Sequence, residues 1–133
     1  MVLKSLFRQL NVCSCLLIVS ILCACNVVEI QLGDINLTDW KKDKYGCLGN
    51  RLSSIGILRD HKDNLLRHSE TEIIKAIGLP EKAELIGHSE KYYSYNIDPA
   101  PECNETSPSS KYLRIRFNSV GHAREVLILD KKR

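Results

Sequence analysis

The amino-acid sequence predicts an α+β fold of two layers, in which N-terminal helices pack on an antiparallel β-meander of three to four strands. Helical spacing of apolar residues and one complete helix-start signal lie between residues 50 and 77. From residue 83 onward, apolar and polar residues alternate in short runs separated by turn residues. Helices that precede such a meander bury their apolar sides against one face of the sheet.

Composition restricts the class of protein. The chain has 133 residues, 44% of them apolar, which is enough for the core of one ordinary domain and too apolar for a disordered chain. Lys4 and Arg8 lie in the first 24 residues. Without them, 17 basic residues remain against 16 acidic ones, a net charge of +1. This balance argues against nucleic acid as a partner, because nucleic-acid-binding domains present a strongly basic face.

Residues 1–24 have the pattern of a signal peptide. Two basic residues and no acidic residue precede an uncharged run of ten at residues 15–24. A membrane-spanning helix needs about 20 apolar residues, so the run is too short to span but fits a signal-peptide core. A plain secretory signal and an uncleaved anchor are alternatives.

The run ends in Leu22-Cys23-Ala24-Cys25, which resembles the bacterial lipobox. The resemblance implies cleavage before Cys25, lipidation of its thiol and two or three acyl chains, which anchor a protein stably in a membrane. Asn26, in place of aspartate, then favours the outer membrane. A metal site at this CxC would need partner ligands, and no CxxC or HxxxH follows.

The mature chain divides into a lipid-anchored tether at residues 25–39 and a single globular domain at residues 40–133. Gly46 and Gly49 prevent a long helix before residue 50. Apolar spacing then predicts a helix over about 50–59, with a less regular continuation.

A capping box gives the clearest local signal. The Ser69 side chain can accept from the third helical N–H, while the Glu72 side chain reaches back to the Ser69 N–H. Gly78 and Pro80 stop the helix, so the prediction is a helix over residues 70–77.

The second half of the chain predicts two hairpins. Residues 98–110 form a proline-rich loop between them. In the strand that follows the loop, Leu113, Ile115 and Phe117 share one face, and Tyr112, Arg114 and Arg116 share the other. The predicted strands span residues 83–86, 91–97, 112–118 and 122–129.

The order of these elements resembles the SmpA/OmlA (BamE-like) family of small outer-membrane lipoproteins. The resemblance spans about residues 65–129 and rests on Ile77-Gly78-Leu79-Pro80, on Tyr92 to Tyr95 and on Leu113 to Gly121. It implies two helices on a three-stranded antiparallel sheet and a role in barrel-protein assembly. The segment with Trp40 and Cys47 has no counterpart in that family.

Two further segments resemble uncharacterised lipoproteins of Bacteroidota-type bacteria. The first has the form D..GC.G.R and the second K.Y.Y...P...C. The matching positions are Asp43, Gly46, Cys47, Gly49 and Arg51 in the first segment, and Lys91, Tyr93, Tyr95, Pro99 and Cys103 in the second.

Cys47 and Cys103 are the only thiols that remain once the signal peptide is removed and Cys25 is lipidated. In an oxidising compartment, two remaining cysteines most simply form one disulfide. Closing a ring of about 57 residues would stabilise the fold by about 4 kcal/mol in the chain-entropy model. Free thiols and a catalytic pair are the alternatives.

The sequence predicts no catalytic residues, no metal site and no cofactor. Asp60-His61 near Ser53 or Ser69 lacks a nucleophile elbow and a glycine-rich oxyanion loop. The four histidines are far apart; His61 and His68 could share a helical face, but seven residues separate them, too far for joint metal ligation. The other two are His88 and His122.

Tyrosine and arginine gather on the predicted sheet. Packing within the core is one interpretation of the tyrosines, with Tyr93 and Tyr95 on one face and Tyr92 on the other. The functional interpretation is an exposed face with Tyr92, Tyr112, Arg114 and Arg116, because tyrosine and arginine are enriched at interface hot spots.

The sequence therefore predicts a lipid-anchored, non-catalytic module at the periplasmic face of the outer membrane. We expect it to contact the membrane through its N-terminal lipid and to bind or scaffold an envelope protein in outer-membrane maintenance or assembly. An inhibitor or ligand-binding lipoprotein of similar shape is the alternative, and a hydrolase is a weaker one.

Overall fold

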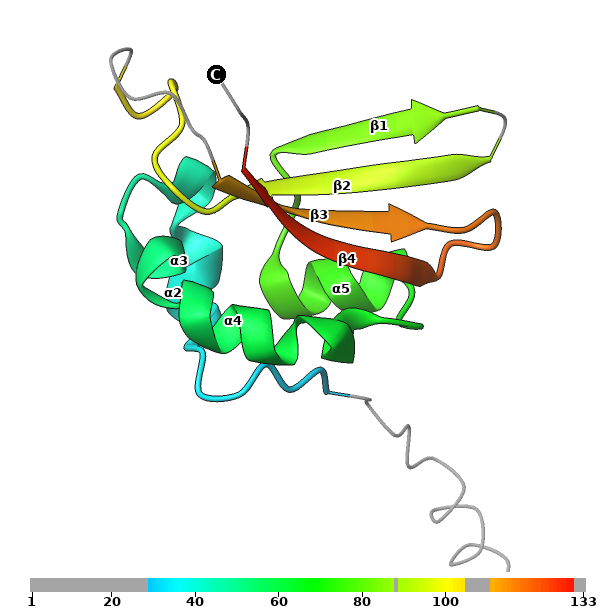
Figure 1. The fold of residues 1–133 in the computed structure, drawn as a ribbon, viewed down its shortest axis with the longest axis horizontal. Coiled ribbons are helices and arrows are strands. Elements are labelled where there is room, and N and C mark those ends of the chain that lie inside the picture. Colours follow the sequence, from blue (N-terminus) through cyan, green and yellow to red (C-terminus); the bar gives the residue numbers. More distant parts are fainter. Residues whose placement is uncertain (1–28, 88, 105–110, 131–133) are drawn as a thin grey trace, which may run out of the picture.

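The computed structural model describes residues 29–87, 89–104 and 111–130. In this part of the chain, four antiparallel strands form one sheet, and the helices cover one of its faces (Figure 1). The strands follow one another in chain order across the sheet: β1 (Lys82–Ile86), β2 (Glu90–Asn96), β3 (Lys111–Phe117) and β4 (Ala123–Asp130). The predicted α+β class is confirmed, and each predicted strand is present within one residue at either end.

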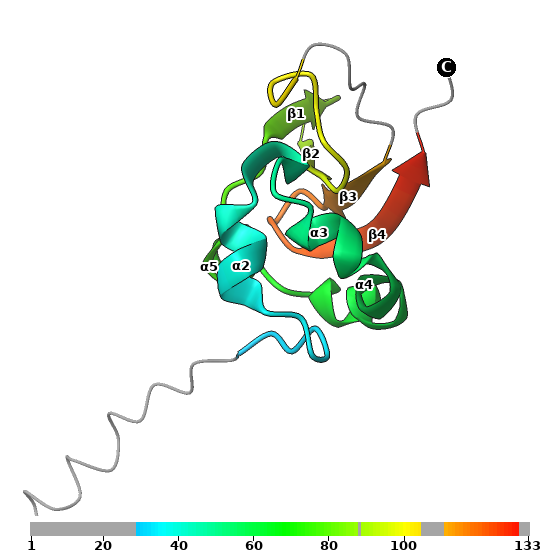
Figure 2. The ribbon, with the colours of Figure 1, turned by 90° about the vertical axis from the view of Figure 1, so that its left-hand side faces the viewer.

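Four α-helices and two 3-10 turns make up the second layer of the described chain. They are α2 (Leu37–Lys42), η1 (Lys44–Gly46), α3 (Asn50–Ser53), α4 (Ile55–His61), η2 (Lys62–Leu65) and α5 (Glu70–Ile77). In the view turned by 90°, α2 and α3 lie in front, at the end of the sheet where β4 finishes (Figure 2). The sheet thus has one strand more, and this layer two helices more, than the SmpA/OmlA resemblance implies.

Helix α5 begins and ends where the sequence predicts. The Ser69 side chain accepts from the Glu72 N–H at 3.3 Å, and the Ser69 N–H donates to the Glu72 carboxylate at 2.7 Å, which completes the capping box. Gly78 follows the last turn with a φ of 90°. Ile73 and Ile77 are fully buried against the sheet.

The helix predicted over residues 50–59 is divided in two. Ser54 separates α3 from α4, and η2 carries the chain on to Leu65. Arg67 then has a φ of 69°, a left-handed conformation that breaks the helical path before α5. His61 and His68 therefore do not share a helical face, as the sequence had suggested they could.

The predicted tether is too long. Ile30, Leu32 and Ile35 are 4%, 2% and 8% exposed and belong to the hydrophobic core, although they lie inside the range 25–39. Helix α2 starts at Leu37 and places Trp40 in the same core. Residues 30–39 are thus part of the globular domain. The signal segment 1–24 and Cys25 lie outside the described residues.

Candidate functional site

The candidate site is the side of the sheet that faces away from the helices, called the outer face below. Side chains alternate along each strand, so directly opposite residues lie on the same side of the sheet. Tyr92 lies opposite Arg116, and Arg114 lies between Ser94 and Leu127. The outer face consists of Lys82, Glu84, Ile86, Glu90, Tyr92, Ser94, Asn96, Tyr112, Arg114, Arg116, Glu125, Leu127 and Leu129.

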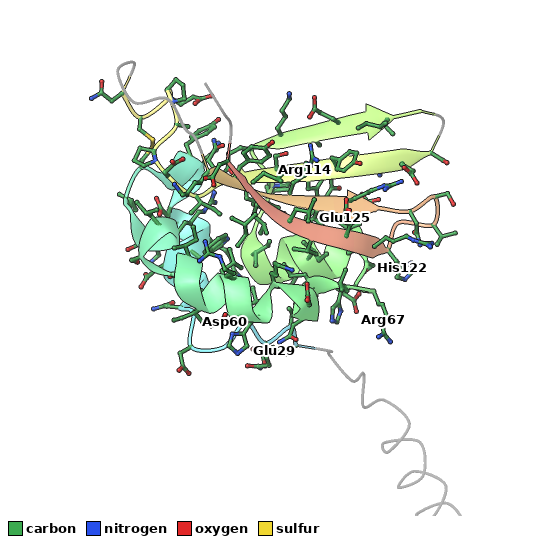
Figure 3. All side chains as sticks on the ribbon, viewed as in Figure 1. Glu29, Asp60, Arg67, Arg114, His122 and Glu125 are labelled. Atoms are coloured by element: carbon green, nitrogen blue, oxygen red, sulfur yellow. A yellow bond between two sulfur atoms is a disulfide. The ribbon has the colours of Figure 1, made fainter. Side chains whose placement is uncertain are left out.

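The four residues predicted to bind a partner are all on this face. Tyr92, Tyr112, Arg114 and Arg116 are each partly buried, and the structure brings them together on β2 and β3. Figure 3 shows Arg114 on the side of the sheet away from the helices, with Glu125 on the neighbouring strand β4. The sequence therefore predicts correctly which residues share this face, whereas their role in binding is not tested by the geometry.

Arg116 is already neutralised by the protein itself. Its guanidinium donates to both carboxylate oxygens of Glu90, at 2.7 and 3.0 Å from Nη2 and at 3.1 Å from Nε. These bonds raise the pKa of Arg116, and the charge of Glu125 on the opposite strand adds to the effect. A bidentate pair of this kind holds the side chain in a fixed orientation. Arg116 thus has little capacity left for a second anion.

Arg114 lacks such a counter-charge. Its guanidinium carbon lies 4.9 Å from the centre of the Tyr92 ring, a cation–π distance. Its Nε is buried and has no hydrogen-bond partner, and no ion pair of Arg114 occurs among the described residues. Buried polar groups without a partner are rare in native proteins. Arg114 is therefore the unusual group of the outer face.

Leu127 and Leu129 were not predicted as part of the site. They lie directly opposite Arg114 and Tyr112 and give the outer face an apolar strip along β4. Continuous apolar residues from Val126 to Leu129 were the available signal, because a half-exposed strand should alternate. The alternation in β3 alone does not reveal this strip.

The inner-face tyrosines serve the fold. Tyr93 donates its hydroxyl to the Glu70 carboxylate at 2.6 Å, and its ring packs edge-on against Phe117. Burial, together with the Glu70 carboxylate, raises the pKa of Tyr93 to about 12. Tyr95 is fully buried and donates to the backbone oxygen of Gly78 at 3.0 Å. Both tyrosines tie α5 to the sheet, as the core-packing interpretation has it.

A buried ion pair joins the N-terminal segment to the sheet. Arg51 is 1% exposed and donates to both Glu81 oxygens, at 2.9 and 3.0 Å, and to the Asn96 carbonyl at 2.9 Å. The guanidinium carbon of Arg51 lies 5.3 Å from the centre of the Trp40 ring and 6.0 Å from the centre of the Tyr95 ring. Because the partners lie 30 to 45 positions apart, no local pattern in the sequence signals this pair.

Asp43 and Gly46 shape the chain around Arg51. The Asp43 carboxylate, fully buried, accepts from the backbone N–H groups of Leu48 at 2.6 Å and Arg51 at 2.8 Å. Gly46 lies so close to the loop after β2 that a Cβ there would be 2.6 Å from the Asp98 carbonyl oxygen. These matched positions of the D..GC.G.R segment thus have structural roles.

Cys47 and Cys103 are placed as the sequence predicts. Their Cα atoms are 5.4 Å apart and their sulfur atoms are at bonding distance. The bond ties the turn before α3 to the loop that follows β2. It lies at the end of the molecule that holds Arg51 and adds a covalent link to that network.

The histidines that the structure describes form no cluster. His61 has its Nδ1 3.0 Å from the Ile57 carbonyl, His68 lies 3.5 Å from Glu72, and His88 is outside the described residues. Within the described residues, no group of three or more histidine, cysteine and acidic side chains could hold a metal ion.

None of the described helices is long and apolar enough to cross a membrane. Comparisons of the chain with protein-family models, with curated proteins and with solved structures found no match.

Proposed function

We propose that this protein is a lipid-anchored, non-catalytic module of the bacterial cell envelope that binds a protein partner through the outer face of its sheet. Acyl chains on Cys25 would hold it at the periplasmic face of the outer membrane. Its role would be outer-membrane maintenance or assembly, as the SmpA/OmlA resemblance implies.

One observation carries the binding role. Tyr92, Tyr112 and Arg114 share the outer face with Leu127 and Leu129, and no described helix covers this face (Figure 3). The solvated face of an antiparallel sheet is normally polar. Tyrosine and arginine side chains are instead enriched at the centre of protein interfaces, where the buried core is also more apolar than the rest of the surface.

The cysteine pair supports the proposed location in the periplasm. Disulfides persist in oxidising environments such as the bacterial periplasm and are rare in the cytosol. Cys47 and Cys103 lie at bonding distance in a domain that follows a signal-like segment. Both features favour export, and the lipobox resemblance adds the anchor.

The test is site-specific photo-crosslinking in intact cells. A photoreactive amino acid replaces Leu129 on the outer face or, as a control, the partly exposed Ile57 on the helical side. We expect a discrete crosslinked protein from position 129 and none from position 57, with loss of the product in Tyr112→Ala.

The identity and position of the crosslinks decide between the roles. Barrel-assembly components, identified by mass spectrometry, would support the assembly role, and an unrelated enzyme would support the inhibitor alternative. Equal products from positions 129 and 57, or a product from position 57 alone, would refute the outer face as the binding surface.

A further inference from the structure

We infer, on the basis of the proposed binding role, that the protein partner places an aspartate or glutamate carboxylate against the guanidinium of Arg114. An apolar side chain beside that carboxylate would pack on Leu127 and Leu129. This names the chemistry of the partner's contact, which the fold and the binding role leave open.

The first argument is the distribution of charge on the outer face. Lys82 is paired with Glu84 at 2.8 Å, and Arg116 is paired with Glu90 at 2.7 Å. Arg114 forms no ion pair with any described residue. It is thus the cation of this face that a partner can neutralise without breaking an existing pair.

The second argument is that the Arg114 side chain is held in a restricted orientation before a partner binds. Stacking on Tyr92 at 4.9 Å restricts the guanidinium of Arg114. A fixed planar guanidinium loses less freedom when it binds a carboxylate in the bidentate manner. The neighbouring leucine at position 127 excludes water from one side of such a contact.

The third argument selects a carboxylate over a phosphate, such as a lipid headgroup. The outer face carries Glu84, Glu90 and Glu125, three acidic residues that match its three basic ones. A surface that binds a membrane or a phosphate clusters several basic side chains without acidic neighbours. One unpaired guanidinium in a balanced surface fits a single negative charge.

Selection of displayed random peptides on the full chain in detergent micelles tests the inference. We expect the selected peptides to share an aspartate or glutamate next to an apolar residue. Arg114→Gln should weaken the best peptide by about tenfold or more, the range for a hydrogen bond to a charged group. The matched control, Arg116→Gln, should weaken it clearly less.

A double-mutant cycle makes the test specific. Changing the peptide's acid to its amide should weaken binding to the wild type by a similar factor and add little to Arg114→Gln. Trp40 fluorescence, measured in parallel, confirms that both variants fold. Peptides without a shared acid, or an acid-to-amide effect that is equal in the wild type and in Arg114→Gln, would overturn the inference.

The crosslinking experiment separates the two proposals. A crosslink from position 129 that persists in Arg114→Gln would leave the binding role in place and refute the carboxylate contact alone. Absence of crosslinks from the outer face of the wild type would refute the binding role itself.

Discussion

Removing the acidic partner of the buried ion pair should cost much of the protein's stability. In Glu81→Ala, Arg51 keeps its charge but loses an acceptor at 2.9 Å, in a site where the two side chains are 2% and 5% exposed. The backbone N–H groups of Tyr45 and Asn96 also lose the Glu81 carboxylate, which accepts from them at 3.3 and 2.9 Å. Breaking a buried pair from one side costs about 3–5 kcal/mol.

The bonds that remain place the expected loss near the lower end of this range. Arg51 still donates to the carbonyl oxygens of Trp40 at 3.1 Å and of Asn96 at 2.9 Å. We therefore expect Glu81→Ala to lower the free energy of unfolding by about 3 kcal/mol. Glu84→Ala is the control, because its pair with Lys82 is 48% and 66% exposed, and such pairs contribute about 0–1 kcal/mol.

Urea unfolding of the full chain in detergent, followed by the fluorescence of Trp40, measures the loss. Trp40 is the protein's single tryptophan, is 1% exposed, and its ring centre lies 5.3 Å from the guanidinium carbon of Arg51. The double variant Arg51→Met, Glu81→Leu should lose less than Glu81→Ala, since apolar residues often replace a buried pair without cost. A loss in Glu81→Ala no larger than in Glu84→Ala would refute the reasoning.

Three further predictions concern the backbone, the pH and the anchor. Gly46→Ala should destabilise the protein more than Gly49→Ala in urea unfolding: both glycines have positive φ, but only at position 46 does a Cβ meet the backbone, 2.6 Å away. The backbone N–H and hydroxyl of Ser69, at the N-cap of α5, lower the pKa of Glu72 below its usual 4.5. The stabilisation of the fold by the ionised Glu72 carboxylate is therefore present above pH 4.5 and is lost as the pH falls through the lowered pKa. Glu72→Gln should thus lose less stability on acidification than the wild type, and an equal loss would contradict this. Labelled palmitate should enter the wild type and Cys23→Ser but not Cys25→Ser; labelling of all three would end the lipidation hypothesis.

Locally determined elements were predicted well from the sequence. Helix α5 depends on Ser69, Glu72 and Gly78, which lie within ten positions of one another and satisfy its ends directly. The strands depend on period-two alternation, which places Leu113 and Ile115 in the core whatever the partner strand is. In these elements, residues close together in the sequence determine the local structure, so it can be predicted without knowledge of the fold.

Elements that depend on distant contacts were not predictable in the same way. Ile30 and Leu32 alternate with polar residues, but this run ends at Gly33 and forms no strand in the structure, and its residues are buried in the core together with Ile35. The Arg51–Glu81 pair joins residues 30 positions apart, and either side chain alone would be expected at the surface. A buried charge becomes plausible only when its partner is known.

The positions that carry the resemblance to lipoproteins of Bacteroidota-type bacteria and the positions proposed to bind a partner are different sets. In the structure, Asp43 and Arg51 organise the N-terminal segment, whereas Tyr93 and Tyr95 fix α5 to the inner face of the sheet. None of these four side chains is on the outer face. A chain that shares them would therefore share the requirements of this fold but not necessarily the contacts around Arg114, so the partner has to be identified from the outer face itself.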